Sequence, residues 1–143
     1  MEPSDILLLQ ETNIEEEALL SISMSKWKKN AGMVVSARGT SGGLESLWSD
    51  DKFLLKTLYA TQHWIYTELQ QLSSKISISL FNIYVPVMLL EKKDCWQSIH
   101  DVLSSKWPEN IILAGDLNIT LNAKEKREAL LSEILLEKLW RTS

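Results

Sequence analysis

Four short segments, spread along 143 residues, constrain the fold of this chain more than any other feature of its sequence. They are Leu-Gln-Glu-Thr at residues 9–12, Ser-Gly-Gly-Leu at 41–44, Asn-Ile-Tyr-Val-Pro at 82–86 and Gly-Asp-Leu-Asn at 115–118. Three of them end an apolar, β-prone run. A side chain just beyond a buried strand is positioned by that strand and opens to solvent, which is where α/β sheets place ligand-binding groups. We therefore expect an α/β protein with a site at its strand ends.

The polar side chains at these strand ends form a set of hard oxygen donors. Glu11 and Asp116 each follow an apolar run, and Tyr84 and Asn118 stand beside them in the motifs. Such donors suit one Mg²⁺ ion and a phosphate. Taken singly, each residue has a plainer explanation: Glu11 as an exposed carboxylate, Asp116 as a turn residue and Tyr84 as a half-buried aromatic.

Hydrophobic periodicity predicts strands and helices along one domain. The expected strands are 5–9, 33–37, 44–49, 53–60, 64–70, 76–84 and 111–114, and the expected helices are 14–24, 89–106 and 124–140. The run at 5–9 is wholly apolar, as in a strand buried on both faces, whereas 76–84 alternates as a half-buried strand does. The strands from 44 to 70 are expected to be antiparallel, and the glycines of 39–43 to form a hairpin.

The order and the residues of the four segments resemble those of the endonuclease/exonuclease/phosphatase superfamily, which has the DNase-I-like fold. Within it, the chain resembles the endonuclease domain of plant non-long-terminal-repeat retrotransposons, a domain associated with reverse transcriptase. The resemblance lies in residues 7–12, 37–48, 81–86 and 111–118. It implies an α/β fold, an incomplete DNase-I-like four-layer sandwich in which two packed mixed sheets are flanked by helices.

The same resemblance implies roles for the strand-end residues. It implies that Glu11 binds one Mg²⁺ or Mn²⁺, that Asp116 orients or deprotonates the attacking water, and that Asn118 holds this water or a phosphate oxygen. Tyr84 is implied to donate a hydrogen bond to the scissile phosphate. The implied substrate is DNA, the implied chemistry is phosphodiester hydrolysis, and no small-molecule cofactor is expected.

The chain lacks two segments that the resemblance leads one to expect, a first strand carrying an asparagine and a last strand carrying Ser-Asp-His. We therefore interpret residues 1–143 as a single partial domain. The chain has two histidines, His63 and His100, as candidates to replace the missing one. We expect an inactive relic of a Mg²⁺-dependent endonuclease that binds its metal weakly. Two alternatives stay open, an active nuclease completed by another chain and a non-catalytic interaction module.

Composition adds mild constraints on partners and location. The net charge of −4 and the pI near 5.2 argue against a basic nucleic-acid-binding surface, although a bound metal would supply positive charge. The single cysteine, Cys95, cannot make an internal disulfide, and no signal peptide or long apolar span is present. These features predict an intracellular chain, nuclear or cytoplasmic and not secreted, with no membrane partner. The missing strands predict self-association through exposed sheet edges.

Overall fold

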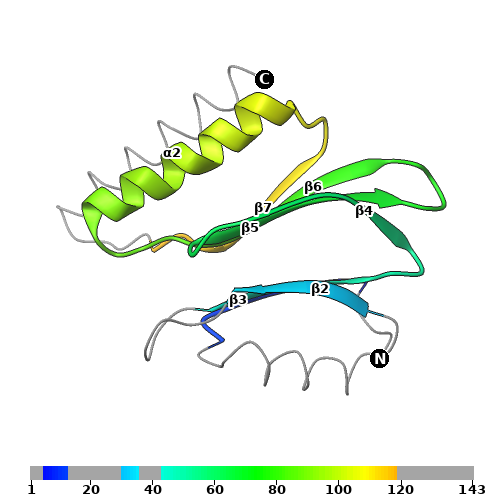
Figure 1. The fold of residues 1–143 in the computed structure, drawn as a ribbon, viewed down its shortest axis with the longest axis horizontal. Helices are drawn as coiled ribbons and strands as arrows, with labels where there is room; N and C mark the ends of the chain where they lie inside the picture. Colours follow the sequence, from blue (N-terminus) through cyan, green and yellow to red (C-terminus); the bar gives the residue numbers. More distant parts are fainter. Residues whose placement is uncertain (1–4, 13–29, 36–42, 119–143) are drawn as a thin grey trace. The chain divides into compact units, whose positions relative to one another are not determined.

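The computed structural model of the chain describes residues 5–12, 30–35 and 43–118 (Figure 1). These residues belong to two compact units. The first holds the described residues up to Tyr84 together with Glu109–Asp116, and the second holds Val85–Pro108 with residues 117 and 118. The expected helices 14–24 and 124–140, and all of the expected hairpin except Gly43, lie outside the described residues.

The first unit contains a three-stranded sheet in the order β1-β3-β2, antiparallel throughout. Its strands are β1 (Ile6–Gln10), β2 (Asn30–Val35) and β3 (Leu44–Ser49). The central strand β3 is buried from Leu44 to Trp48. The two outer strands therefore shield it, and β1 forms one edge of the sheet within the described part of the chain.

A second sheet in the same unit has four strands in the order β4-β5-β6-β7. They are β4 (Phe53–Ala60), β5 (Trp64–Gln71), β6 (Ser77–Tyr84) and β7 (Ile111–Asp116). The first three are antiparallel neighbours, whereas β7 runs parallel to β6. A parallel neighbour needs a long crossover connection, and the segment between β6 and β7 supplies it.

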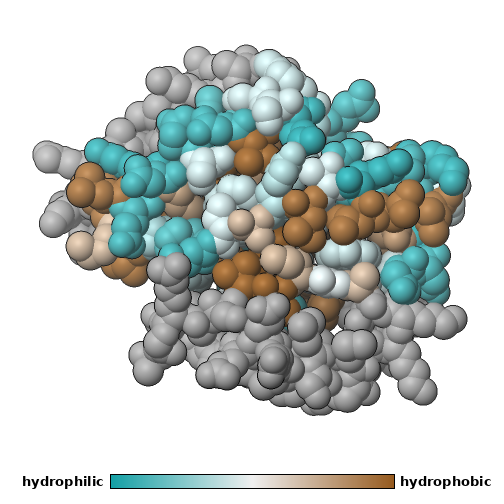
Figure 2. Space-filling model, viewed as in Figure 1, coloured by the Kyte–Doolittle hydropathy of each residue, from teal (hydrophilic) through white to brown (hydrophobic). Residues whose placement is uncertain are grey.

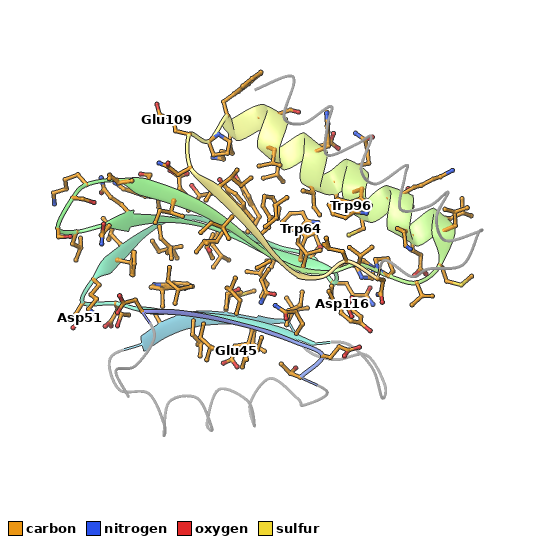
Figure 3. The ribbon with its side chains drawn as sticks, turned by 180° about the vertical axis from the view of Figure 1, so that it is seen from behind. Glu45, Asp51, Trp64, Trp96, Glu109 and Asp116 are labelled. Atoms are coloured by element: carbon orange, nitrogen blue, oxygen red, sulfur yellow. The ribbon has the colours of Figure 1, made fainter. Side chains whose placement is uncertain are left out.

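The two sheets share a hydrophobic core. It is built from Trp48 of the first sheet and Phe53, Leu69 and Leu80 of the second, with partly buried aliphatic side chains around them. Figure 3 shows side chains of both sheets meeting between them. Because β1, β3 and β6 all contribute to this packing, the ends of β1 and β6 are held close to each other.

The opposite face of the second sheet carries a cluster of aromatic side chains from β4, β5 and β6. Phe81 is central, with ring centroids 5.4 Å from Trp64 and 4.8 Å from Tyr66. Tyr59 stacks on Tyr66 at 5.9 Å. The Tyr66 hydroxyl is hydrogen-bonded to the hydroxyl of Ser79 at 3.0 Å, so this buried polar group has a partner.

In the second unit, the segment Leu89–Lys106 forms helix α2, which confirms the expected bounds. The helix ends at Trp107, which adopts a left-handed conformation with φ of 47°. Its backbone N–H donates to the carbonyl of Leu103 at 3.0 Å, and Pro108 follows. A left-handed residue with this hydrogen bond is a common way to end a helix, and a proline after it prevents continuation.

The side chains of Cys95, Trp96 and Ile99 in α2 are buried, at the helical spacing expected from the sequence. Cys95 is a free thiol, as expected. Burial raises its pKa to about 12, so the thiol stays protonated at neutral pH and is a poor nucleophile. No helix among the described residues is both long enough and apolar enough to cross a membrane.

Several predicted element bounds are confirmed and others are wrong. The strands 44–49 and 53–60 are confirmed at both ends, but they belong to different sheets and do not pair. β2 begins at Asn30 and not at residue 33, because its pairing with β3 continues to Ser49. β7 runs on to Asp116 because its parallel pairing continues to Tyr84.

Two predictions about strand environment are also wrong. β1 was expected to be buried on both faces, yet Leu7 is 37% exposed because this strand is a sheet edge within the described part of the chain. β6 was expected to be half-buried, yet Phe81 and Ile83 are fully buried because β6 is an inner strand with packing on both faces. Hydrophobic side chains reach the surface in several places (Figure 2).

Candidate active site

Three of the four predicted site residues lie at strand ends in the first unit. Glu11 directly follows β1, Tyr84 is the last residue of β6 and Asp116 is the last residue of β7. Tyr84 and Asp116 are paired in the parallel register of β6 and β7. The two therefore sit side by side at the carboxyl edge of the second sheet, which is the edge where α/β sheets hold ligands.

A hydrogen bond brings Glu11 to this edge from the other sheet. The Tyr84 hydroxyl donates to the Glu11 carboxylate oxygen Oε1 at 2.7 Å. Glu11 itself is exposed and has a left-handed backbone conformation, with φ of 51°. This conformation is uncommon for residues other than glycine and costs conformational energy. Strained residues of this kind cluster at functional sites.

Backbone geometry requires a glycine at position 115, directly before Asp116. Gly115 has φ of 138°, in the region that side chains rarely adopt. A Cβ atom at this position would lie 1.9 Å from the carbonyl oxygen of Ile83 on the neighbouring strand. Glycine thus permits the close approach of β7 to β6 that places Asp116 beside Tyr84.

Asn118, the fourth predicted site residue, is described with the second unit. Its backbone is left-handed, with φ of 46°. Its side-chain Nδ2 donates to the carbonyl of Val85, and its own carbonyl accepts a hydrogen bond of 3.2 Å from the Nζ of the buried Lys92. Within its unit, Asn118 therefore joins the start of the crossover segment to the loop that follows β7.

Sequence reasoning missed a second polar contact between the sheets. The Gln10 side-chain Nε2 donates to Asn82 Oδ1 at 2.7 Å, and Asn82 is fully buried. The resemblance implies a structural hydrogen-bonding role for Asn82 and no chemistry, but it does not identify Gln10 as the partner. The available signal was a polar amide within the apolar strand 76–84, because a buried amide needs partners.

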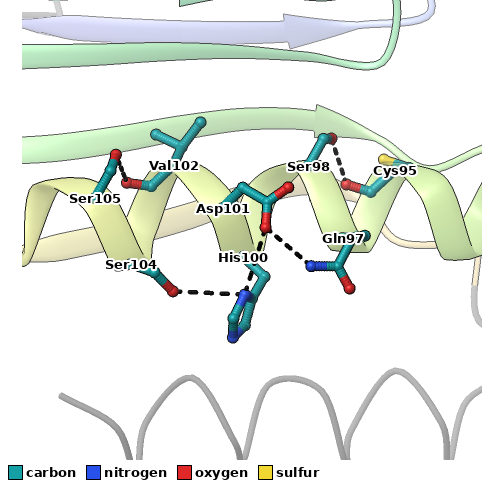
Figure 4. Close-up of polar contacts among 8 residues, drawn as sticks. All are labelled: Cys95, Gln97, Ser98, His100, Asp101, Val102, Ser104 and Ser105. Carbon is teal, nitrogen blue, oxygen red and sulfur yellow. Dashed lines mark hydrogen bonds and ion pairs between the residues drawn. The ribbon is translucent and has the colours of Figure 1, made fainter.

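The two histidines lie in different surroundings. His63 lies in the turn between β4 and β5, and its backbone carbonyl accepts the N–H of Tyr84 at 2.8 Å. His100 lies on α2, where its Nδ1 is 3.4 Å from the Ser104 hydroxyl and 3.8 Å from an Asp101 carboxylate oxygen (Figure 4). His63 is therefore the backbone neighbour of a predicted site residue.

The oxygen donors of the candidate site suit a hard cation, but they are few in number. Among the described residues, no three His, Cys, Asp or Glu side chains lie close enough together to hold a metal ion. Glu11 and Asp116 supply two carboxylates, and the buried hydroxyl oxygen of Thr12 has no hydrogen-bond partner in the described part of the chain. A Mg²⁺ held by one or two carboxylates keeps several water ligands. The residues present therefore fit a weak, largely hydrated metal site.

The chain matches no protein-family model and no curated protein. It is similar to solved structures at low sequence identity. With the AP endonuclease of Leishmania major the TM-score is 0.67 at 15% identity, over 96% of this chain and 56% of that one. With humanized D. rerio TDP2 the TM-score is 0.60 at 15% identity, over 87% and 56%. With ANGEL2, a 2′,3′-cyclic phosphatase, it is 0.60 at 17% identity, over 84% and 41%. The chain thus spans about half the length of the structures that it matches.

Proposed function

Because the chain has the DNase-I-like α/β fold of these solved structures, we propose that it is part of a Mg²⁺-dependent phosphodiester endonuclease domain. We propose further that it derives from a plant retrotransposon, is located inside the cell and has lost turnover. The observation that carries the proposal is the meeting of Glu11, Tyr84 and Asp116 at three strand ends, with one direct hydrogen bond between two of them. DNA is the proposed substrate, since one of the similar proteins is an AP endonuclease.

In this proposal each strand-end residue has one role. Glu11 and Asp116 lie where a divalent cation would find carboxylate oxygens, and such an ion neutralises charge on a phosphate. Asp116 orients or deprotonates the attacking water, and Tyr84 donates a hydrogen bond to the phosphate. Asn118 holds the water or a phosphate oxygen. The Tyr84 hydroxyl donates to Glu11 at 2.7 Å, which keeps this donor beside the residue that would hold the cation.

The proposed loss of turnover follows from the chain's histidines. No histidine follows Asn118 in the sequence, so the Asp-His pair implied by the resemblance is not supplied from that direction. Removing one electrostatic donor at a reacting oxyanion costs roughly 10²- to 10³-fold in rate. Residues 1–143 supply neither this histidine nor its aspartate after Asn118, and turnover by these residues alone is therefore expected to be negligible.

Metal binding tests the site itself. We expect calorimetric titration of the purified chain with Mg²⁺ or Mn²⁺ to show weak binding that depends on Glu11. Glu11→Gln removes an anionic ligand and should weaken binding at least tenfold, which corresponds to about 1.4 kcal/mol. The matched control is Glu109→Gln, which removes the same charge from an exposed residue near the opposite end of β7. Equal titrations of wild type and Glu11→Gln would remove Glu11 from the site.

The same preparation tests turnover. No nicking of supercoiled plasmid is expected with Mg²⁺. Metal-dependent nicking that disappears in Asp116→Ala would contradict the proposed inactivity and favour the active-enzyme alternative. His63→Gln and His100→Gln would then identify any substitute histidine.

A non-catalytic alternative is favoured by a specific observation, the exposure of apolar side chains on two edge strands. Leu7 on β1 is 37% exposed and Ile112 on β7 is 49% exposed, although both strands have the apolar composition of inner strands. Each strand ends the order of its sheet within the described residues. Edge strands of this kind recruit further strands. We propose that the chain associates with other chains, including its own copies, through these edges.

Sedimentation velocity tests this association. Wild type should show a concentration-dependent increase in sedimentation coefficient, and the double variant Leu7→Lys/Ile112→Lys should remain monomeric, because charge on an edge strand opposes pairing. Leu90→Lys, which changes a 76% exposed leucine of α2, is the control and should behave as wild type. A wild-type chain that stays monomeric at every concentration would contradict self-association.

A further inference from the structure

We propose that Gln10 and Asn82 are positioning residues, whose side-chain amides clamp the two sheets together and thereby place Glu11 beside Tyr84. The contact between the two amides, 2.7 Å long, joins residues that are 72 positions apart in the sequence. The inference rests on the proposed function only in taking Glu11 as the metal ligand. Its structural part, the placement of Glu11, can be tested without a metal.

The hydrogen-bonding capacity of the buried Asn82 amide is used by two strands of the first sheet, β1 and β3. Its Oδ1 accepts from Gln10 Nε2, while its Nδ2 donates to the backbone carbonyls of Leu9 at 3.1 Å and Glu45 at 2.8 Å. Nδ2 also lies 3.3 Å from the hydroxyl of Ser46. One side chain of β6 therefore holds β1 and β3, the adjacent strands of the other sheet.

These contacts fix the orientation of both amides. If the Asn82 amide were rotated by 180°, its oxygen would face two carbonyl oxygens, which are also acceptors. The orientation with Nδ2 toward Leu9 and Glu45 is therefore the stable one. It leaves Oδ1 toward β1, where only a donor can satisfy it, and Gln10 Nε2 is that donor. A carboxylate at either position would set acceptor against acceptor.

The clamp lies directly next to the candidate site. Gln10 ends β1 and is followed by Glu11, while Asn82 lies two residues before Tyr84 and on the same face of β6. Two contacts of 2.7 Å thus bridge the two sheets in succession, Gln10 to Asn82 and Tyr84 to Glu11. The first is part-buried and ends on the fully buried Asn82, whereas the second is exposed. The contact to the buried Asn82 is therefore the one suited to fixing where β1 ends and where Glu11 begins.

Gln10→Met tests the clamp, because methionine keeps the length of the side chain but cannot donate to Asn82. We expect Mg²⁺ or Mn²⁺ affinity to fall about tenfold, corresponding to 1.4 kcal/mol. The control is Leu69→Ala, which opens the core between the sheets without touching either amide. It should unfold at a lower denaturant concentration than Gln10→Met yet bind the metal as wild type does. Equal binding by wild type and folded Gln10→Met would overturn the inference.

A second measurement reads the position of Glu11 without metal. The ¹³C resonance of the Glu11 carboxyl carbon should shift in Gln10→Met and remain unchanged in Leu69→Ala. The side-chain amide protons of Asn82 should exchange with solvent much more slowly than those of the exposed Gln62. If wild type binds no metal, the proposed metal site fails, while a shifted Glu11 resonance still supports the clamp. An unshifted resonance, or fast exchange at Asn82, would overturn it.

Discussion

Gly115→Ala is expected to destabilise the first unit by about 2–6 kcal/mol, the sum of backbone strain and overpacking that each cost about 1–3 kcal/mol. The new methyl group would lie 1.9 Å from the carbonyl oxygen of Ile83, and the backbone φ of 138° is unfavourable for alanine. Neither cost can be relieved by a side-chain rotation, because the obstructing atom belongs to the backbone. Urea unfolding at low protein concentration measures the change.

The control for Gly115→Ala is Ala114→Gly, one residue earlier in the same strand. It removes a Cβ where the other variant adds one, and glycine in a strand interior costs only about 0.5–1 kcal/mol relative to alanine. A Gly115→Ala protein as stable as Ala114→Gly would mean that β7 does not approach β6 as closely as described. In that case the pairing of Tyr84 with Asp116 would also be in doubt.

Phe81→Ala is the second substitution with a large expected effect. Truncating a fully buried phenylalanine typically costs about 3–5 kcal/mol, through lost burial and the cavity that remains. Here the substitution also removes the ring that contacts both Trp64 and Tyr66, and such aromatic pairs contribute about 0.5–1.5 kcal/mol beyond burial. The unfolding midpoint should fall, and the near-ultraviolet circular dichroism of Trp64 should weaken.

Phe81→Leu serves as the matched variant, since it keeps an apolar side chain but not the aromatic ring. A swap between hydrophobic side chains of similar volume usually costs less than about 1.5 kcal/mol. The dichroism signal should be lost in both variants, because both lack the ring, whereas a large loss of stability is expected only in Phe81→Ala. This result would distinguish the effect of the ring contacts from the effect of apolar burial. Equal stability of wild type and Phe81→Ala would contradict the central place of Phe81 in the aromatic cluster.

Local sequence signals predicted the elements whose ends are set locally. Helix 89–106 is confirmed at both ends, because the proline at 108 and the apolar spacing of Trp96 and Ile99 depend only on neighbouring residues. The DNase-I-like fold class is confirmed as well. That expectation came from the order of the four motifs, so it depended on the resemblance and not on periodicity.

The errors concern properties that depend on distant residues. The environment of β1 depends on which strands flank it, and its wholly apolar sequence does not carry that information. The serine and isoleucine alternation of β6 indicated one exposed face, but Phe81 on that face packs against Trp64 and Tyr66 of β5. The separation of β3 from β4 likewise follows from packing between the sheets, whereas the expected antiparallel pairing of β4 with β5 is confirmed.

The candidate site was predicted in part. The strand-end positions of Glu11, Tyr84 and Asp116 were expected, whereas the Gln10 to Asn82 contact and the steric requirement at Gly115 were not. A hydrogen bond between residues 72 apart has no local sequence signature, and a glycine that follows an apolar run is equally compatible with a simple turn. Both features need the neighbouring strand to be in place before they can be recognised.

The two strands that lead to the carboxylates are also the edge strands of their sheets in the described residues, while β3, β5 and β6 hold the buried core. Glu11 and Asp116 are both exposed, and substitutions at exposed positions usually change stability by no more than about 0.5 kcal/mol. Selection for folding alone would therefore place little constraint on either carboxylate, although it would retain Asn82 and Gly115. Under selection for folding alone, mutation would therefore replace the two carboxylates long before it altered the strands that position them.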